Sequence, residues 1–228
     1  MVEAKRGEPQ HPEGLTEAQE RLSAQLFDIG AIKFGDFRLK LHDKSPEAPL
    51  SPVYIDLRIL RRFPEAKATA VDVYQELVHP LEFDLLADIP TAATPLVSSL
   101  SDRLGVGMIT PRTDNKAHGS GAKIDGLQDS DRGKVAVLID DLVTRADSKL
   151  EAAGILTGQG VRVNDVVVLI DREQGGQQQL ATKGFTLHSA LTMNRMLDFY
   201  ARVGKIDQNR HRDAMQRLEA LNEFLRMT

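Results

Sequence analysis

The chain has 228 residues, which suits one α/β domain, and 41% of them are hydrophobic, enough for a substantial core. Its 29 Lys and Arg stand against 33 Asp and Glu, so it lacks the global basic field of a nucleic-acid-binding protein. The absence of cysteine excludes disulfides and thiolate metal sites, and it favours a cytoplasmic protein. We expect no membrane-spanning segment and no signal peptide, because no apolar run has the required length.

The predicted elements alternate between helices and strands along the chain. Residues 1–14 are polar, with prolines and glycines, and predict a disordered tail. Beyond them, apolar residues recur with the period of a helix or of a strand, and turn residues separate the segments. We expect helices at 15–30, 65–78, 95–104, 148–157, 193–203 and 207–227, and strands at 34–41, 53–57, 83–89, 107–110, 135–139, 161–170 and 185–190.

This alternation predicts an α/β fold with a doubly wound, mainly parallel sheet. Polar clusters follow three of the predicted strands, at Pro90-Thr91, Asp140-Asp141 and Asp171-Arg172. In such a sheet these strand ends converge on the crevice where ligands bind. The polar segment 111–133 shows no apolar periodicity, and loops of that length in compact domains are usually functional or disordered.

The most informative segment is the aliphatic strand 135–139, which ends in Asp140 and Asp141. Because adjacent strand residues point to opposite faces, we expect these carboxylates to act together only where the strand frays into the following loop. Carboxylates accept hydrogen bonds from sugar hydroxyls, and a loop at a helix N-terminus suits a phosphate. Ser148 and Glu151 match a capping box at the start of that helix. A strand end with two solvated acids is the alternative interpretation.

The chain resembles the orotate phosphoribosyltransferases of the type I phosphoribosyltransferase fold. Residues 137–144, VLIDDLVT, are similar to the motif for phosphoribosyl pyrophosphate (PRPP), which by itself identifies only the superfamily. Segments 34–40 and 51–58 are similar to orotate enzymes, and 111–119 resembles their mobile catalytic loop. The most specific segment is 168–176, VLIDREQGG, which resembles the orotate half of bifunctional UMP synthases.

The resemblance implies an enzyme that converts orotate and PRPP to orotidine 5′-monophosphate and pyrophosphate in de novo pyrimidine (UMP) biosynthesis. It implies a single domain at 15–228, with a small N-terminal hood at about 15–62 plus C-terminal parts, a core at about 63–200 and a mobile loop at about 111–133. Mg²⁺ is the expected cofactor, carried mainly by PRPP near Asp140 and Asp141 without a direct protein ligand. The expected assembly is a cytoplasmic homodimer whose loop reaches the partner's site, with no nucleic-acid or membrane partner.

The resemblance also assigns roles to individual residues. The expected catalytic residues are Lys116, His118 and Asp141, with Lys116 as the principal one. The expected PRPP-binding residues are Arg112, Lys116, His118, Asp140, Asp141, Leu142, Val143, Thr144, Arg145, Ala146, Asp147 and Ser148. The expected orotate-binding residues are Lys40, Tyr54, Ile55, Thr144 and Arg172. Two alternatives stay open: a surface ion pair of Arg172 with Asp171 or Glu173, and simple core packing of Tyr54.

The sequence departs from the family pattern at several positions. Thr113 stands where many members carry a second loop lysine, and 43–50 looks like an insertion. Ala146 and Asp147 replace the usual glycines of the phosphate loop, where Asp147 adds a negative charge that Arg145 can offset. These departures leave two alternative functions open: a phosphoribosyltransferase for another base, and a PRPP-binding regulator or pseudoenzyme.

Overall fold

The computed structural model describes residues 14–112 and 123–227. Its main sheet has six strands in the order β5-β4-β3-β6-β7-β8. They are β3 (Leu85–Asp88), β4 (Met108–Pro111), β5 (Ile124–Asp125), β6 (Val135–Val143), β7 (Arg162–Asp171) and β8 (Thr186–Thr192). Neighbouring strands are parallel except for β4 and β5. The predicted mainly parallel α/β sheet is therefore confirmed.

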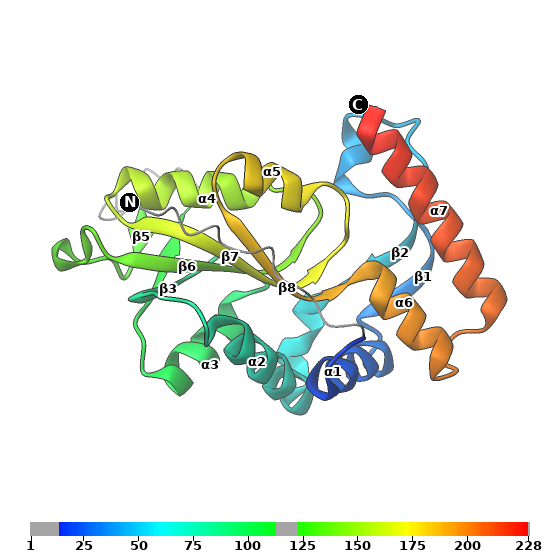
Figure 1. The fold of residues 1–228 in the computed structure, drawn as a ribbon, viewed down its shortest axis with the longest axis horizontal. Helices are drawn as coiled ribbons and strands as arrows, with labels where there is room; N and C mark the ends of the chain where they lie inside the picture. The colour runs from blue at the N-terminus through cyan, green and yellow to red at the C-terminus, as the bar shows by residue number, and fades with distance from the viewer. Residues whose placement is uncertain (1–13, 113–122, 228) are drawn as a thin grey trace, which may run out of the picture.

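Helices cover both faces of this sheet (Figure 1). On one side lie α1 (Glu17–Asp28), α2 (Pro64–Val78) and α3 (Thr94–Leu104), and on the other α4 (Asp147–Gly158) and α5 (Gly176–Thr182). Val137 and Ile139 of β6 belong to one buried cluster, whereas Ala136 and Leu138 belong to a second. Because successive side chains point to opposite faces, β6 is buried on both sides, as its continuous apolar sequence predicts.

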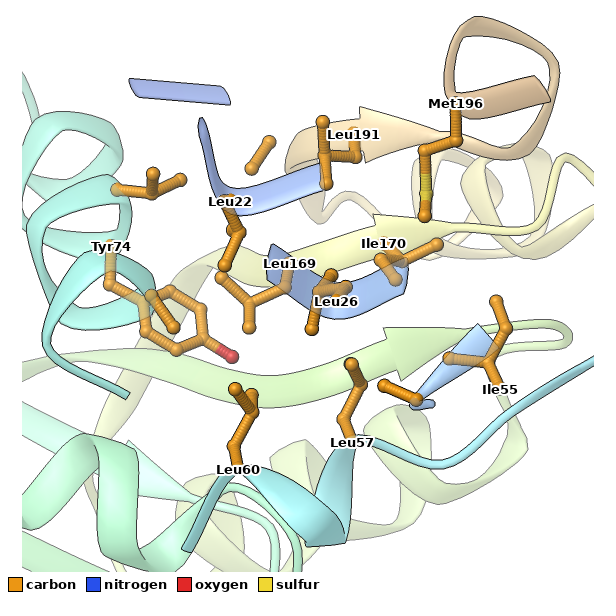
Figure 2. Close-up of a cluster of buried hydrophobic side chains, with 14 of the residues drawn as sticks. Leu22, Leu26, Ile55, Leu57, Leu60, Tyr74, Leu169, Ile170, Leu191 and Met196 are labelled. Atoms are coloured by element: carbon orange, nitrogen blue, oxygen red, sulfur yellow. The ribbon is translucent and has the colours of Figure 1, made fainter. Parts of the chain in front are cut away.

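The larger cluster joins the sheet to the helices on its first side. Figure 2 shows Leu22 and Leu26 of α1 beside Leu169 of β7, with the ring of Tyr74 from α2 nearby. These side chains are almost completely buried. Removing this much apolar surface from water is the main force that fixes the helices on the sheet.

A second, two-stranded sheet lies beside the main one. Its strands β1 (Ile32–Phe37) and β2 (Ser51–Ile55) are antiparallel, and α6 (Met193–Arg202) and α7 (Gln208–Met227) lie next to them (Figure 1). Arg217 of α7 pairs with the Asp36 carboxylate of β1, so the last helix is joined to the first strand here. This unit, which we call the hood, borders the end of the main sheet where β7 finishes.

The structure corrects two predictions near the hood and the long loop. Residues 40–41 do not end a strand, because η1 (Lys40–Asp43) is a 3-10 turn whose His42 ring accepts the backbone N–H of Leu39 at 2.8 Å. The segment 111–133 is predicted as one long polar loop, yet it contributes β5, which pairs with the end of β4, and the short turn η3 (Asp129–Asp131).

Three further corrections concern β6 and the helices α4 and α5. Strand β6 continues to Val143 instead of ending at 139. Helix α4 begins at Asp147, and its N-cap residue Ala146 makes no side-chain cap. The predicted capping box of Ser148 and Glu151 is therefore wrong. Helix α5 was not predicted, because its seven residues are too few to show a clear helical period.

Candidate active site

The two acids of the most informative segment lie inside β6 and not beyond it. Their carboxylates lie close enough together for the charge of Asp140 to raise the pKa of Asp141. Asp140 faces α4, where its Oδ2 lies 2.6 Å from Nζ of Lys149. Burial, together with the nearby charges of Asp141 and Asp140, raises the pKa of the Tyr74 phenol well above its usual value. Of the two acids, only Asp140 forms an ion pair within the described residues.

Asp140 is buried and fully engaged within the chain. Its Oδ1 accepts the backbone N–H of Asp141 at 2.8 Å, and its Oδ2 pairs with Lys149. The hydroxyl of Tyr74 donates to the Asp140 carbonyl at 2.8 Å. Lys149 also donates to the carbonyl of Leu142 at 2.6 Å, so one lysine ties the strand end to α4.

The sequence analysis missed Lys149. It lies on the buried face of α4 in helical register with Ala152, Ala153 and Leu156. A lysine on an otherwise apolar helical face was the available signal, because lysine is rarely buried without a partner.

Asp141 has a pKa that is raised toward neutral pH. Burial is the main cause that raises its pKa to about 7, and the neighbouring charge of Asp140 adds to this, whereas Lys149 opposes it. Its Oδ1 accepts the backbone N–H of Leu142 at 2.8 Å. Near neutral pH this carboxyl is therefore poised between its charged and neutral forms, which is typical of functional sites.

The loop between β6 and α4 is the predicted phosphate-binding segment. The backbone N–H of Ala146 donates to Oε1 of Gln179 on α5 at 2.7 Å, so this amide has a partner within the chain. Gly176 packs tightly beneath the loop, since a Cβ there would lie 2.5 Å from Val143 Cγ2 and 3.1 Å from the Thr144 carbonyl oxygen. The exposed residues of the loop are Arg145, Asp147 and Ser148.

Arg172 follows β7 and is only 4% exposed. Its Nη2 donates to Oγ of Ser51 at 3.0 Å and to the carbonyl of Val53 at 3.3 Å, both in β2. Its Nε donates to Oε1 of Gln174 at 3.3 Å. Burial lowers the pKa of the guanidinium to about 10, since a buried cation without a counter-ion is destabilised.

The proposed surface ion pair of Arg172 is not formed among residues 14–112 and 123–227. Asp171 instead accepts the backbone N–H of Glu173 at 2.7 Å, and Glu173 accepts that of Asn194 at the start of α6 at 2.9 Å. Beside Arg172, the buried Nε2 of Gln174 has no hydrogen-bond partner in the described part of the chain. A buried guanidinium and an unused amide donor thus lie together, which suits an anionic acceptor.

Three predicted orotate-binding residues belong to the hood and its turn. The Tyr54 ring lies 5.5 Å from that of Phe37, and its hydroxyl accepts a hydrogen bond from Arg58 at 3.1 Å, so packing accounts for much of its surroundings. Ile55 is buried in the large core cluster. Lys40 is exposed at the start of η1.

Of the predicted pyrophosphate-binding cations of the loop, Arg112 lies within the described residues. Arg112 is exposed, and its Nη1 lies 3.3 Å from the Asp125 carboxylate across the β4–β5 pair. Lys116, His118 and Thr113 lie outside the described residues, as does most of the tail 1–14. Their predicted roles and conformations stay predictions.

The third strand end, after β3, is organised by a buried carboxylate. Asp88 is fully buried and accepts hydrogen bonds from the hydroxyls of Thr94 and Thr110. Arg61 donates to the carbonyl of Thr91 at 3.1 Å. Since β3, β6 and β7 are adjacent and parallel, the three polar strand ends meet at one edge of the sheet, as predicted.

Comparison with known proteins identifies the family. Over 174 residues the chain is 35% identical to the orotate phosphoribosyltransferase of Methanopyrus kandleri, which covers 76% of this chain and 89% of that relative. The chain belongs to the orotate phosphoribosyltransferase family. No protein-family model matches it.

Two further comparisons link this orotate phosphoribosyltransferase family member to longer proteins. It is 35% identical to the bifunctional enzyme PyrF/PyrE of Nostoc sp. over 82% of this chain and 37% of that relative. The solved UMP synthase of Leishmania donovani superposes with a TM-score of 0.78 at 30% identity, over 89% of this chain and 42% of that one. The chain therefore spans well under half the length of these two relatives.

The predicted family resemblance and the predicted type I phosphoribosyltransferase fold are thus confirmed. None of the helices in residues 14–112 and 123–227 is long and apolar enough to cross a membrane.

Proposed function

We propose that this protein is an orotate phosphoribosyltransferase that joins orotate to PRPP, giving orotidine 5′-monophosphate and pyrophosphate in UMP biosynthesis. One observation carries the proposal. Two acids and a loop that leads into a helix share a sheet edge with Arg172, a buried guanidinium that has no carboxylate partner in the described chain. The acids and the loop suit a sugar phosphate, and the guanidinium suits a base that carries an anionic group.

Asp141 is the acid that we assign to the ribose. Asp140 already pairs with Lys149, which leaves Asp141 as the more available acceptor for the ribose hydroxyls. A carboxylate there would also stabilise the positive charge that develops at ribose C1 as pyrophosphate leaves. The predicted phosphate contacts of 142–148 come from the loop backbone at the N-terminus of α4 and from the side chains of Thr144, Arg145 and Ser148.

The residues suit Mg²⁺ that is held mainly by the substrate. Within the described ranges no three or more His, Cys, Asp or Glu side chains are grouped to hold a metal ion. Mg²⁺ commonly binds through one or two carboxylates and substrate phosphates, and Asp140 and Asp141 offer such oxygens. When bound with PRPP, Mg²⁺ would neutralise charge on the leaving pyrophosphate.

Arg172 is the residue that we assign to the carboxylate of orotate. Ser51 and Val53 already fix its Nη2, so the guanidinium is oriented before a ligand arrives. A planar guanidinium can bind a carboxylate through two parallel hydrogen bonds. Thr144, Lys40 and the backbone at Tyr54 and Ile55 would complete the base site.

The pyrophosphate is assigned to the cationic loop. Arg112, Lys116 and His118 would gather on this polyanion, with Lys116 as the principal catalytic residue. We further propose a homodimer in which the loop reaches the partner's site. A cytoplasmic location completes the proposal and accords with the cysteine-free sequence.

A spectrophotometric assay tests the proposed function. Purified protein with PRPP and Mg²⁺ should consume orotate and release pyrophosphate, EDTA should stop the reaction, and uracil, hypoxanthine and adenine should not replace orotate. Consumption of another base in preference to orotate would overturn the base assignment. Binding of PRPP without pyrophosphate release, with every base, would favour a regulator over an enzyme.

A further inference from the structure

We propose that Lys149 is a positioning residue of the sugar-phosphate site, which holds Asp140 and the β6–α4 loop in the arrangement that receives PRPP. The inference rests on the proposed function, because it concerns the same site.

The three N–H donors of the Lys149 ammonium group all have nearby acceptors. Its side chain is only 5% exposed, and its Nζ lies 2.6 Å from Oδ2 of Asp140 and 2.6 Å from the carbonyl oxygen of Leu142. Ser148 Oγ lies 3.5 Å away. An ammonium has three N–H donors, so each has an acceptor within or at the limit of hydrogen-bond distance.

Placing a charged lysine at this position costs free energy that its partners must offset. It lies in the first turn of α4, where the helix dipole is unfavourable to a positive charge. Its neighbours on the buried face are Ala152, Ala153 and Leu156, so an apolar side chain would pack there without any desolvation of charge. The chain instead places a cation at the junction of strand, loop and helix.

A buried cation at this junction changes the charge that an incoming sugar phosphate meets. Asp140 and Asp141 are adjacent acids, and Asp147 adds a third carboxylate at the start of α4. Lys149 compensates one of these charges from beneath the loop. By engaging Asp140 it also leaves Asp141 as the acid that meets the ligand.

The test replaces Lys149 and uses a second lysine as the control. Lys149→Met removes the charge and every donor, whereas Lys149→Gln removes the charge but keeps one donor group, so it is the variant to measure if Lys149→Met does not fold. The matched control is Lys134→Met, because Lys134 pairs with Asp131 at 2.8 Å next to the opposite end of β6. The readouts are the KM values for PRPP and orotate, the pH profile of kcat/KM for PRPP, and PRPP affinity by calorimetry.

We expect both Lys149 variants to raise the KM for PRPP about tenfold or more. They should also move the acid limb of the pH profile upward by about one pH unit, because a nearby cation favours the charged form of a carboxyl. The KM for orotate and the Lys134→Met enzyme should stay within about twofold of wild type. An unchanged pH midpoint with a PRPP KM close to that of wild type would overturn the inference. Wild-type protein that binds PRPP but turns over no base would instead overturn the proposed function, and calorimetry would still decide the role of Lys149.

Discussion

Arg172 at the end of β7 donates a hydrogen bond to Oγ of Ser51 at the start of β2, across 3.0 Å and 121 positions of sequence. This contact joins the main sheet to the hood. It explains why the hood matters to the proposed chemistry, because the residue assigned to orotate is held from both units. The base would then lie between the sheet edge and the hood.

Replacing Arg172 tests this assignment. Arg172→Ala should raise the KM for orotate by about ten- to a hundredfold, since a hydrogen bond to a charged group contributes about 1.5–3 kcal/mol. The KM for PRPP should change by less than about threefold, and steady-state kinetics with each substrate varied in turn measures both values. Arg226→Ala is the matched control, because Arg226 is an exposed arginine of α7 that pairs with Glu219. Equal losses for orotate and PRPP would contradict a specific carboxylate contact.

Asp141 gives a prediction about pH and stability. Its pKa in the folded protein is about 7, above the ordinary value of 3.8, so between these values the folded state binds more protons than the unfolded state. Stability should therefore fall as pH rises through this range. Asp141→Asn removes the ionisation, and it should be more stable than wild type at pH 8 by about 1–2 kcal/mol but not at pH 4.

Urea denaturation of wild type and Asp141→Asn at several pH values measures this difference. The variant should also lose PRPP turnover, because an amide cannot supply the negative charge. A stability difference that is the same at pH 4 and pH 8 would rule out the proposed titration of Asp141.

Gly176 gives a prediction about packing beneath the phosphate loop. Gly176→Ala would place a methyl group 2.5 Å from Val143 Cγ2 and push against Thr144, so it should destabilise the protein by about 1–3 kcal/mol and weaken PRPP binding. Gly154→Ala in α4 meets nothing within 4 Å and should leave stability equal or raise it by up to about 1 kcal/mol. Thermal unfolding and PRPP titration measure both effects. Equal stability of the two variants would show that the loop relaxes freely around position 176.

Lys116 tests the loop assignment. Lys116→Ala should lower kcat by about a hundredfold or more, as the loss of a charged group that stabilises a transition state does, while the melting temperature stays unchanged. Lys123→Ala is the control, because Lys123 is exposed just beyond the same segment. Circular dichroism establishes that the variants are folded, and near-normal turnover of Lys116→Ala would remove this lysine from its proposed role.

Local sequence patterns were sufficient to predict the sheet and the edge where the site lies. Apolar runs bounded by turn residues located the five parallel strands of the main sheet, though not the antiparallel β5. The polar residues at the ends of β3, β6 and β7 marked the edge where these strands meet. Six helices of eight or more residues were also located in the described chain, because they are long enough to show their period. The start of α4 was displaced by one residue because Asp147, and not Ser148, opens that helix.

The contacts that define the candidate site could not be predicted in the same way. The ion pair of Lys149 with Asp140 and the hydrogen bond of Arg172 to Ser51 depend on how separate elements pack, which no local pattern encodes. The same holds for Gln179, which lies on the unpredicted helix α5 and accepts a hydrogen bond from the backbone N–H of Ala146. Tertiary contacts of this kind override local preference.

The most direct test of the central claim is the stoichiometry of the reaction, measured as pyrophosphate released for each orotate consumed by purified protein with PRPP and Mg²⁺. The account predicts one pyrophosphate for each orotate, and it predicts that Asp141→Asn and Arg172→Ala both lower the rate. Pyrophosphate release that does not depend on orotate, or no release while PRPP is bound, would contradict it.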